Sequence, residues 1–154
     1  MQIAATDRIE KSVEIKASPA RVWRALTDHR EFGAWFRVNM EGPFEPGRSV
    51  KGRSTHPGYE HVVLEMVDVV LRPEEYFSFR WRPYALDPAV DYSKEPRTLV
   101  EFRLEPAAVG TLLRVTESGF DGIPAWRRDE AFRMNSEGWD EEMGNIKVYV
   151  ERER

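Results

Sequence analysis

The side chains that most often carry chemistry are sparse in this chain, and they fall in no recognised catalytic or metal-binding spacing. The histidines are His29, His56 and His61, and none stands in an HxH or HExxH pattern. The 154-residue sequence has no cysteine, which excludes thiolate catalysis, zinc–thiolate sites and redox switching. No GxSxG elbow marks a serine as a nucleophile. We therefore predict no catalytic residue, no metal and no cofactor.

The segment GPFEPGRS, residues 42–49, has the letters of a phosphate-binding loop with arginine in place of its lysine. A phosphate-binding loop follows a strand and opens a helix, whereas this segment follows predicted helices and leads into a strand near Ser49. Pro43 and Pro46 also lack the backbone N–H groups that would hold a phosphate. The segment therefore predicts a turn and not a nucleotide site.

Two pairs of adjacent acidic residues could in principle move protons. Glu74 and Glu75 fall at a predicted turn, and Glu141 and Glu142 fall on a predicted helix, opposite its apolar stripe. Charged side chains in such places are ordinarily solvated. We predict that both pairs lie at the surface.

The first elements are a strand and a helix that follow one another directly. Apolar and polar residues alternate from Ile9 to Lys16, which is typical of a strand with one covered face. Ser18 is a good N-cap and Pro19 suits the first helical position, so a helix should open there and end near Asp28. A second short helix should follow, up to Trp35 and Phe36.

The middle of the chain predicts antiparallel strands. They cover about Glu60 to Leu71, Tyr76 to Arg82, Arg97 to Glu105 and Thr111 to Ser118. Strict alternation in the second of these places its aromatic residues on the inner face and Arg80 on the outer face. The connection from Pro83 to Pro96 contains three prolines and is too long for a tight hairpin. We expect this connection to act as a lid over a binding site.

A long helix from about Ala125 to Val150 should close the chain. One apolar stripe runs along it, made of Phe132, Trp139, Met143, Ile146 and Val150. At the helical rise per residue this helix would be roughly 39 Å long. A run of antiparallel strands and one large apolar helix face predict an α+β fold, in which a curled sheet wraps around the helix.

Four stretches of the sequence resemble the START-like superfamily of helix-grip, hydrophobic-cavity proteins. Within it they are most similar to homologues of the activator of the heat-shock-protein-90 ATPase. The stretches are SPARVWRALTDHREFGAWF from Ser18, FSFRWRP from Phe77, ESGFDGIP from Glu117 and NSEGWDEEMGNIKVYV from Asn135. The resemblance implies a single helix-grip domain over residues 1–154.

The same resemblance implies a cavity between the sheet and the long helix. Ligand-binding residues expected near its wall are Trp35, Phe79, Trp81, Phe120, Trp126, Trp139 and Met143, with Glu117 and Asn135 as polar groups that orient a ligand. Arg80 would take that role if the faces of its strand were inverted. Taken singly, each aromatic is more typical of packed core, and Glu117 of an exposed carboxylate. A buried Glu117 would need a hydrogen-bonding partner or would be neutral.

Composition limits the partners and the location. Lys plus Arg number 23 and Asp plus Glu 27, with the signs interspersed and no basic block, which argues against nucleic acid. No apolar run approaches the length of a membrane span, so we expect a cytoplasmic protein.

Our leading hypothesis is a non-catalytic module that binds a small, mostly apolar organic ligand. The first alternative is a small enzyme of the cyclase or dehydratase type that uses Glu117 or Asn135 in the same cavity. The second alternative, a protein-interaction domain associated with a chaperone, is implied by the resemblance only.

Overall fold

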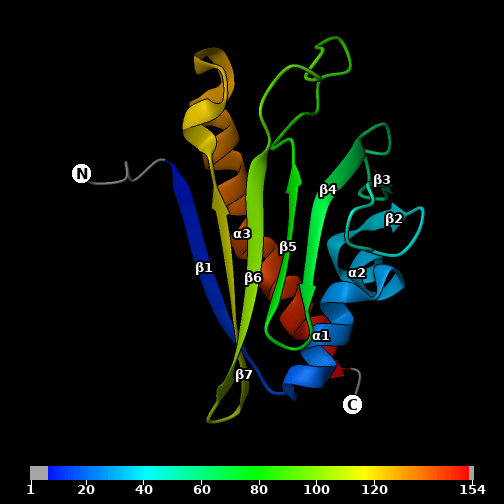
Figure 1. The fold of residues 1–154 in the computed structure, drawn as a ribbon, viewed down its shortest axis with the longest axis vertical. Coiled ribbons are helices and arrows are strands. Elements are labelled where there is room, and N and C mark those ends of the chain that lie inside the picture. Colours follow the sequence, from blue (N-terminus) through cyan, green and yellow to red (C-terminus); the bar gives the residue numbers. More distant parts are fainter. Residues whose placement is uncertain (1–6, 153–154) are drawn as a thin grey trace.

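The computed structural model describes residues 7–152, and its elements follow the predicted order (Figure 1). In chain order they are β1 (Arg8–Ile15), α1 (Pro19–Thr27), α2 (His29–Phe36), β2 (Val38–Met40), β3 (Val50–Ser54), β4 (Val63–Arg72), β5 (Tyr76–Trp81), β6 (Thr98–Ala107), β7 (Gly110–Ser118), the 3-10 turn η1 (Phe120–Gly122) and α3 (Ala125–Arg152). The predicted α+β helix-grip fold is confirmed.

The described residues form a seven-stranded antiparallel sheet in the order β1-β7-β6-β5-β4-β3-β2. The sheet curls without closing. Part of the curl comes from a β-bulge, because the pairing of β4 with β5 shifts by one residue between Val67 and Val70. Asp68, inside the bulge, has the left-handed φ of 55°. An extra residue on one strand bends that strand and increases its twist.

Side-chain caps define the two short helices as the sequence predicts. The Ser18 hydroxyl accepts a hydrogen bond from the backbone N–H of Arg21 (3.2 Å) at the start of α1. The Asp28 carboxylate accepts from the N–H groups of Arg30 and Glu31 and so starts α2. Asp28 thus marks the predicted end of the first helix. Arg37, in the left-handed conformation, ends α2 and turns the chain into β2.

Two boundaries differ from the prediction. The strand expected from Glu60 begins only at Val63, because residues 56–62 form hydrogen-bonded turns, with the N–H of Tyr59 donating to the carbonyl of His56. The short strand β2 was not predicted, so segment 42–49 follows a strand and not a helix. It still leads into β3 and opens no helix, as predicted.

The faces of β5 are as predicted. Phe77 and Phe79 are completely buried and Trp81 is 7% exposed. The Arg80 side chain is exposed and lies 3.8 Å from the Asp68 carboxylate. Arg80 is therefore on the outer face, so the inverted arrangement in which it would face a ligand does not apply.

Helix α3 lies across one face of the sheet, and its N-terminal end is near the loop between β5 and β6 (Figure 1). It begins at Ala125, as predicted, and ends at Arg152. The buried side chains of α3 include Ala131, Trp139, Met143, Ile146 and Val150. The inner faces of sheet and helix therefore form one core, with Phe102 and Trp139 packed edge to face at 5.7 Å.

Candidate functional site

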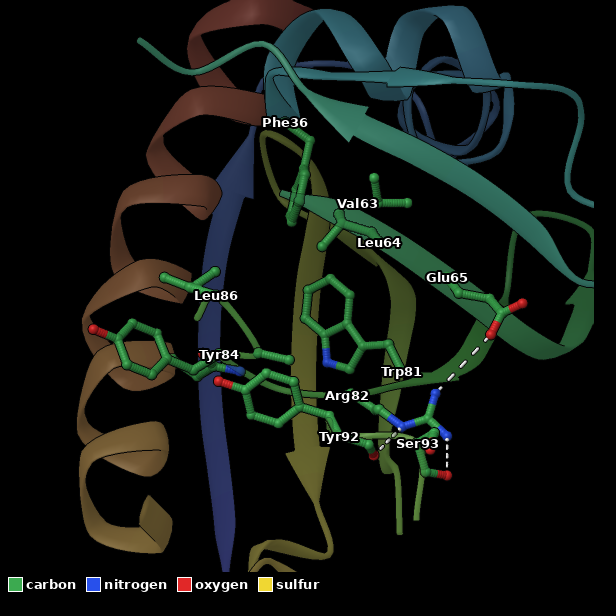
Figure 2. A pocket seen from close by; sticks show the side chains of 12 residues that line it. Phe36, Val63, Leu64, Glu65, Trp81, Arg82, Tyr84, Leu86, Tyr92 and Ser93 are labelled. Carbon is green, nitrogen blue, oxygen red and sulfur yellow. Dashed lines mark hydrogen bonds and ion pairs between the residues drawn. The ribbon is translucent and has the colours of Figure 1, made fainter. Parts of the chain in front are cut away.

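A pocket of about 360 Å³, here called the outer pocket, opens between β4, β5, α3 and the loop that joins β5 to β6 (Figure 2). Most of its lining side chains are apolar or aromatic. They are Phe36, Val63, Leu64, Glu65, Trp81, Arg82, Tyr84, Ala85, Leu86, Tyr92, Ser93 and Asn135. A concave, mainly apolar space with a few polar groups is the usual form of a small-molecule site.

Two smaller spaces adjoin the outer pocket and share its walls. The inner recess, of about 110 Å³, lies against α3 and is lined by Phe36, Trp81, Asn135, Gly138, Trp139 and Glu142. The side recess, of about 230 Å³, lies toward β2 and β3 and shares Phe36, Leu64 and Leu86 with the outer pocket. The ring of Phe36, at the end of α2, borders all three spaces.

A buried carboxylate lies behind the walls of the outer pocket and inner recess. Glu117, on β7, is 0% exposed, so the alternative interpretation of this residue as an exposed carboxylate is wrong. The indole N–H groups of Trp81 and Trp139 each donate to it at 2.8 Å. The Thr98 hydroxyl donates at 2.6 Å and the Asn135 amide at 2.9 Å. Four elements, β5, β6, β7 and α3, therefore meet at this one side chain.

This network fixes the orientation of the pocket wall. Burial raises the pKa of the Glu117 carboxyl above its ordinary value, and the four donors oppose that rise. Both carboxylate oxygens accept from N–H groups, so the indole planes of Trp81 and Trp139 have little rotational freedom. The lone pairs of Glu117 are occupied by protein donors, which leaves this carboxylate poorly placed to exchange protons with a ligand.

A buried arginine holds the loop that forms the outer wall of the pocket. Arg127, in the first turn of α3, is 4% exposed. Its guanidinium donates two hydrogen bonds to one oxygen of Glu95, at 2.9 and 2.6 Å, and further bonds to the carbonyls of Pro83 and Tyr84. It also lies 4.7 Å from the centre of the Tyr92 ring. Both ends of the loop are therefore attached to one cation.

Glu142 departs from the predicted surface position. It lies on α3 beside the buried stripe, is half-buried, and borders both the inner recess and the side recess. Burial raises the pKa of its carboxyl from an ordinary 4.5 to about 8; the hydrogen bond from Asn145 opposes the rise and the charge of Glu141 adds to it. Glu141 is exposed, as predicted.

The predicted ligand-binding residues fall into three groups. Trp81, Asn135 and Trp139 border the outer pocket or the inner recess, with Glu117 directly behind them. Four of the predicted residues are buried in the core and border none of the three spaces, namely Trp35, Phe79, Phe120 and Met143. The last predicted residue, Trp126, is 66% exposed and lies away from the core, so its predicted place in the cavity wall is wrong.

Sequence reasoning missed several residues of the wall. Phe36, Leu64, Tyr84, Leu86 and Tyr92 line the outer pocket. Three of these lie in the loop from Pro83 to Pro96, which was predicted as a lid but has no periodicity from which side-chain directions could be read. Phe36 is the last residue of the first stretch that resembles the family, and this position was the one sequence feature that could have indicated its place in the pocket wall.

Metal-binding clusters and membrane-spanning helices are two further features that the described residues lack. Within residues 7–152, no group of three or more histidine, aspartate and glutamate side chains is arranged to hold a metal ion. The helices of this part of the chain include none with the length and hydrophobicity needed to cross a membrane.

Comparisons with known proteins agree with the fold. Residues 16–151 match the family model of activator of Hsp90 ATPase homolog 1-like proteins. Curated proteins include no match to the chain. The solved structure of protein MLL2253 from Mesorhizobium loti aligns with a TM-score of 0.74 at 23% identity, over 94% of this chain and 97% of that one.

Two further structures are similar. DynU16, a protein in the dynemicin biosynthetic locus, aligns with a TM-score of 0.73 at 23% identity, over 96% of this chain and 48% of that one. Aha1 from Colwellia psychrerythraea, a dimer in solution, aligns at 0.70 and 20% identity, over 94% and 96%. At these identities the likeness concerns the fold. Because the family model covers most of its length, this chain belongs to the family of activator of Hsp90 ATPase homolog 1-like proteins.

Proposed function

We propose that this protein binds a small, mostly apolar organic molecule in the outer pocket and the inner recess, without transforming it. The observation that carries the proposal is the pocket itself, which combines apolar walls from four parts of the chain with a wall fixed by the Glu117 network. A START-like domain of this family is a suitable scaffold for such a role.

The arrangement of polar groups favours binding over catalysis. The Asn135 side chain borders both spaces, and its amide nitrogen is engaged with Glu117, so its carbonyl oxygen can accept a hydrogen bond from a ligand. Glu117 is enclosed by its donors. The proposed enzyme role of these two residues would require a free proton acceptor at the pocket wall, and this pair does not supply one.

The loop from Pro83 to Pro96 is proposed to gate the pocket. It contributes Tyr84, Leu86 and Tyr92 to the wall, and its attachment through Arg127 is a set of polar contacts that can open together. A bound molecule in contact with the loop would stabilise the closed form and slow cleavage by trypsin after Lys94.

The test uses a neutral fluorescent probe, phenylnaphthylamine, and two matched variants. Leu86 lies in the wall shared by the outer pocket and the side recess, so the larger side chain in Leu86→Trp should occupy part of the pocket volume. Val109→Trp adds the same ring at an exposed position in the β6–β7 turn. We expect saturable binding of about one equivalent, weakened about tenfold or more by Leu86→Trp and unchanged by Val109→Trp. Native mass spectrometry of freshly purified protein would identify a retained natural ligand. Probe binding that is equal in all three proteins would overturn the proposal.

A further inference from the structure

The inner recess differs in chemistry from the rest of the pocket. Three aromatic rings, those of Phe36, Trp81 and Trp139, lie along its wall with centroids 5.8 to 6.1 Å apart. Aromatic rings carry partial negative charge on their faces and attract cations within about 6 Å. The recess, at about 110 Å³, has room for a small head group and not for a whole ligand.

Two carboxyl groups lie close to this aromatic corner. Glu142 borders the recess directly, and Glu117 lies behind the two tryptophans. In the described part of the chain, the hydrogen-bond donors to Glu117 are two indoles, a hydroxyl and an amide, and the donor to Glu142 is the amide of Asn145. These donors are all uncharged, so in this part of the chain neither carboxyl group is paired with a contacting cation.

Glu142 is also placed to meet a ligand. Glu142 borders the inner recess and the side recess, and the Asn145 amide donates to only one of its carboxylate oxygens, Oε1, at 2.9 Å. A group that enters the inner recess from the outer pocket passes Phe36, Trp81 and Asn135, which border both spaces. The second oxygen of Glu142 is thus available to a donor on the ligand.

We propose that the inner recess binds an organic ammonium group, so that the ligand is an apolar amine whose nitrogen pairs with Glu142 and lies against the rings of Phe36, Trp81 and Trp139. This inference rests on the proposed function and deepens it, because it assigns the chemical class of the ligand. A carboxylate or phosphate in the recess would face two carboxyl groups. An ammonium would complement them and form a charge-assisted hydrogen bond.

Pairing of the ammonium with Glu142 should release a proton. Near neutral pH the half-buried Glu142 carboxyl is mostly protonated, because its pKa is raised to about 8. An ammonium binds the ionised carboxylate, so one proton leaves Glu142 for solvent when the amine binds. The affinity for the amine should therefore rise as pH increases from about 6 to about 8.

Other titratable or charged groups face this corner and must be separated from Glu142 in the test. Arg37 lies at the end of α2, and His56 and Tyr59 line the side recess from the segment between β3 and β4. Glu117 faces it from β7 through Trp139. A proton release that belongs to any of these would persist when Glu142 is replaced.

The experiment measures displacement of phenylnaphthylamine by three matched probes, naphthylethylamine, naphthylethanol and naphthylacetate, from pH 6 to 8.5. Calorimetry of the amine in two buffers of different ionisation enthalpy gives the number of protons released. Glu142→Gln keeps the shape and removes the ionisable group. Glu137→Gln, at an exposed position of the same helix, is the control.

We expect the amine to bind about tenfold or more tightly than the alcohol at pH 8, the acid to bind least, and close to one proton to be released near pH 7. Glu142→Gln should remove both the preference and the proton release while leaving the alcohol within about twofold, and Glu137→Gln should change neither. If the alcohol binds as tightly as the amine, or the preference survives in Glu142→Gln, the ammonium assignment is wrong and the apolar pocket remains. If phenylnaphthylamine binds but the amine does not displace it, the ammonium assignment fails alone, whereas absence of phenylnaphthylamine binding overturns the proposed function.

Discussion

Replacement of Arg127 by methionine should release the loop that closes the outer pocket. The Arg127 and Glu95 side chains are 4% and 10% exposed, and the guanidinium makes four hydrogen bonds to the loop. Removal of one partner from a buried ion pair costs about 3–5 kcal/mol, because the remaining charge is left without compensation. In Arg127→Met that charge is Glu95, which regains water only when the loop opens.

The assay is limited cleavage by trypsin, followed by mass spectrometry of the intact chain. Lys94 is exposed and is the one lysine or arginine between Pro83 and Pro96, and Arg82 is protected by the proline that follows it. A loss of 3 kcal/mol in closure corresponds to a factor of roughly 100 in the open population, since about 1.4 kcal/mol is tenfold. We expect cleavage after Lys94 to accelerate about 100-fold, up to the rate of a fully open loop.

Arg30→Met is the matched control, because Arg30 is an exposed residue at the start of α2. It should leave the rate of cleavage after Lys94 within about twofold. Acceleration of less than tenfold in Arg127→Met would refute the reasoning, as would equal acceleration in both variants. Denaturant midpoints of the two proteins separate local opening of the loop from global unfolding.

Three further outcomes follow from the same structure. Trp139→Ala should lower the free energy of unfolding by about 3–5 kcal/mol in denaturant titrations, because the indole is 3% exposed and donates to Glu117; a loss below about 1 kcal/mol would contradict its placement. The free energy of unfolding should fall by roughly 1–4 kcal/mol as pH rises from about 5 to about 8, because the pKa of Glu142 is raised in the folded state and its ionisation opposes folding. Glu142→Gln should lack this pH-dependent loss, and an identical pH profile in the variant would contradict the assignment. A chelator should leave the thermal midpoint unchanged, since residues 7–152 contain no candidate metal cluster; a drop restored by one divalent ion would contradict this.

The predictable parts of the fold are those in which apolar and polar residues repeat with the period of a strand or a helix. Alternation in β5 predicted that the strand face with Phe77, Phe79 and Trp81 is buried. The apolar stripe of α3 predicted the buried helix face that carries Trp139. Both rest on repeated geometry that a single chain displays directly. The element order then followed from covering one sheet face with one helix.

The parts that could not be predicted depend on contacts between distant segments. Arg127 reads as a surface cation, and only the position of Glu95 and two carbonyls makes its burial favourable. Trp126, next to it, reads as a wall residue but is turned to solvent, because the buried position in that turn is occupied by Arg127. Glu142 reads as solvated, yet it lies next to Met143 at the margin of the buried stripe, where the recess begins.

The pairing of the first strand with the last has a consequence for how the chain folds. Ile9 is paired with Glu117 and Ile15 with Thr111, so residues roughly a hundred positions apart are neighbours, and closing such a loop is slow. The four donors around Glu117 come from β5, β6 and α3, and the network is complete only when α3 has docked. During synthesis, the early strands and the aromatic residues of β5 therefore stay without their covering helix until the end of α3 has left the ribosome. The same long-range closure that shapes the pocket therefore leaves the unfinished chain with exposed apolar surface, which favours aggregation.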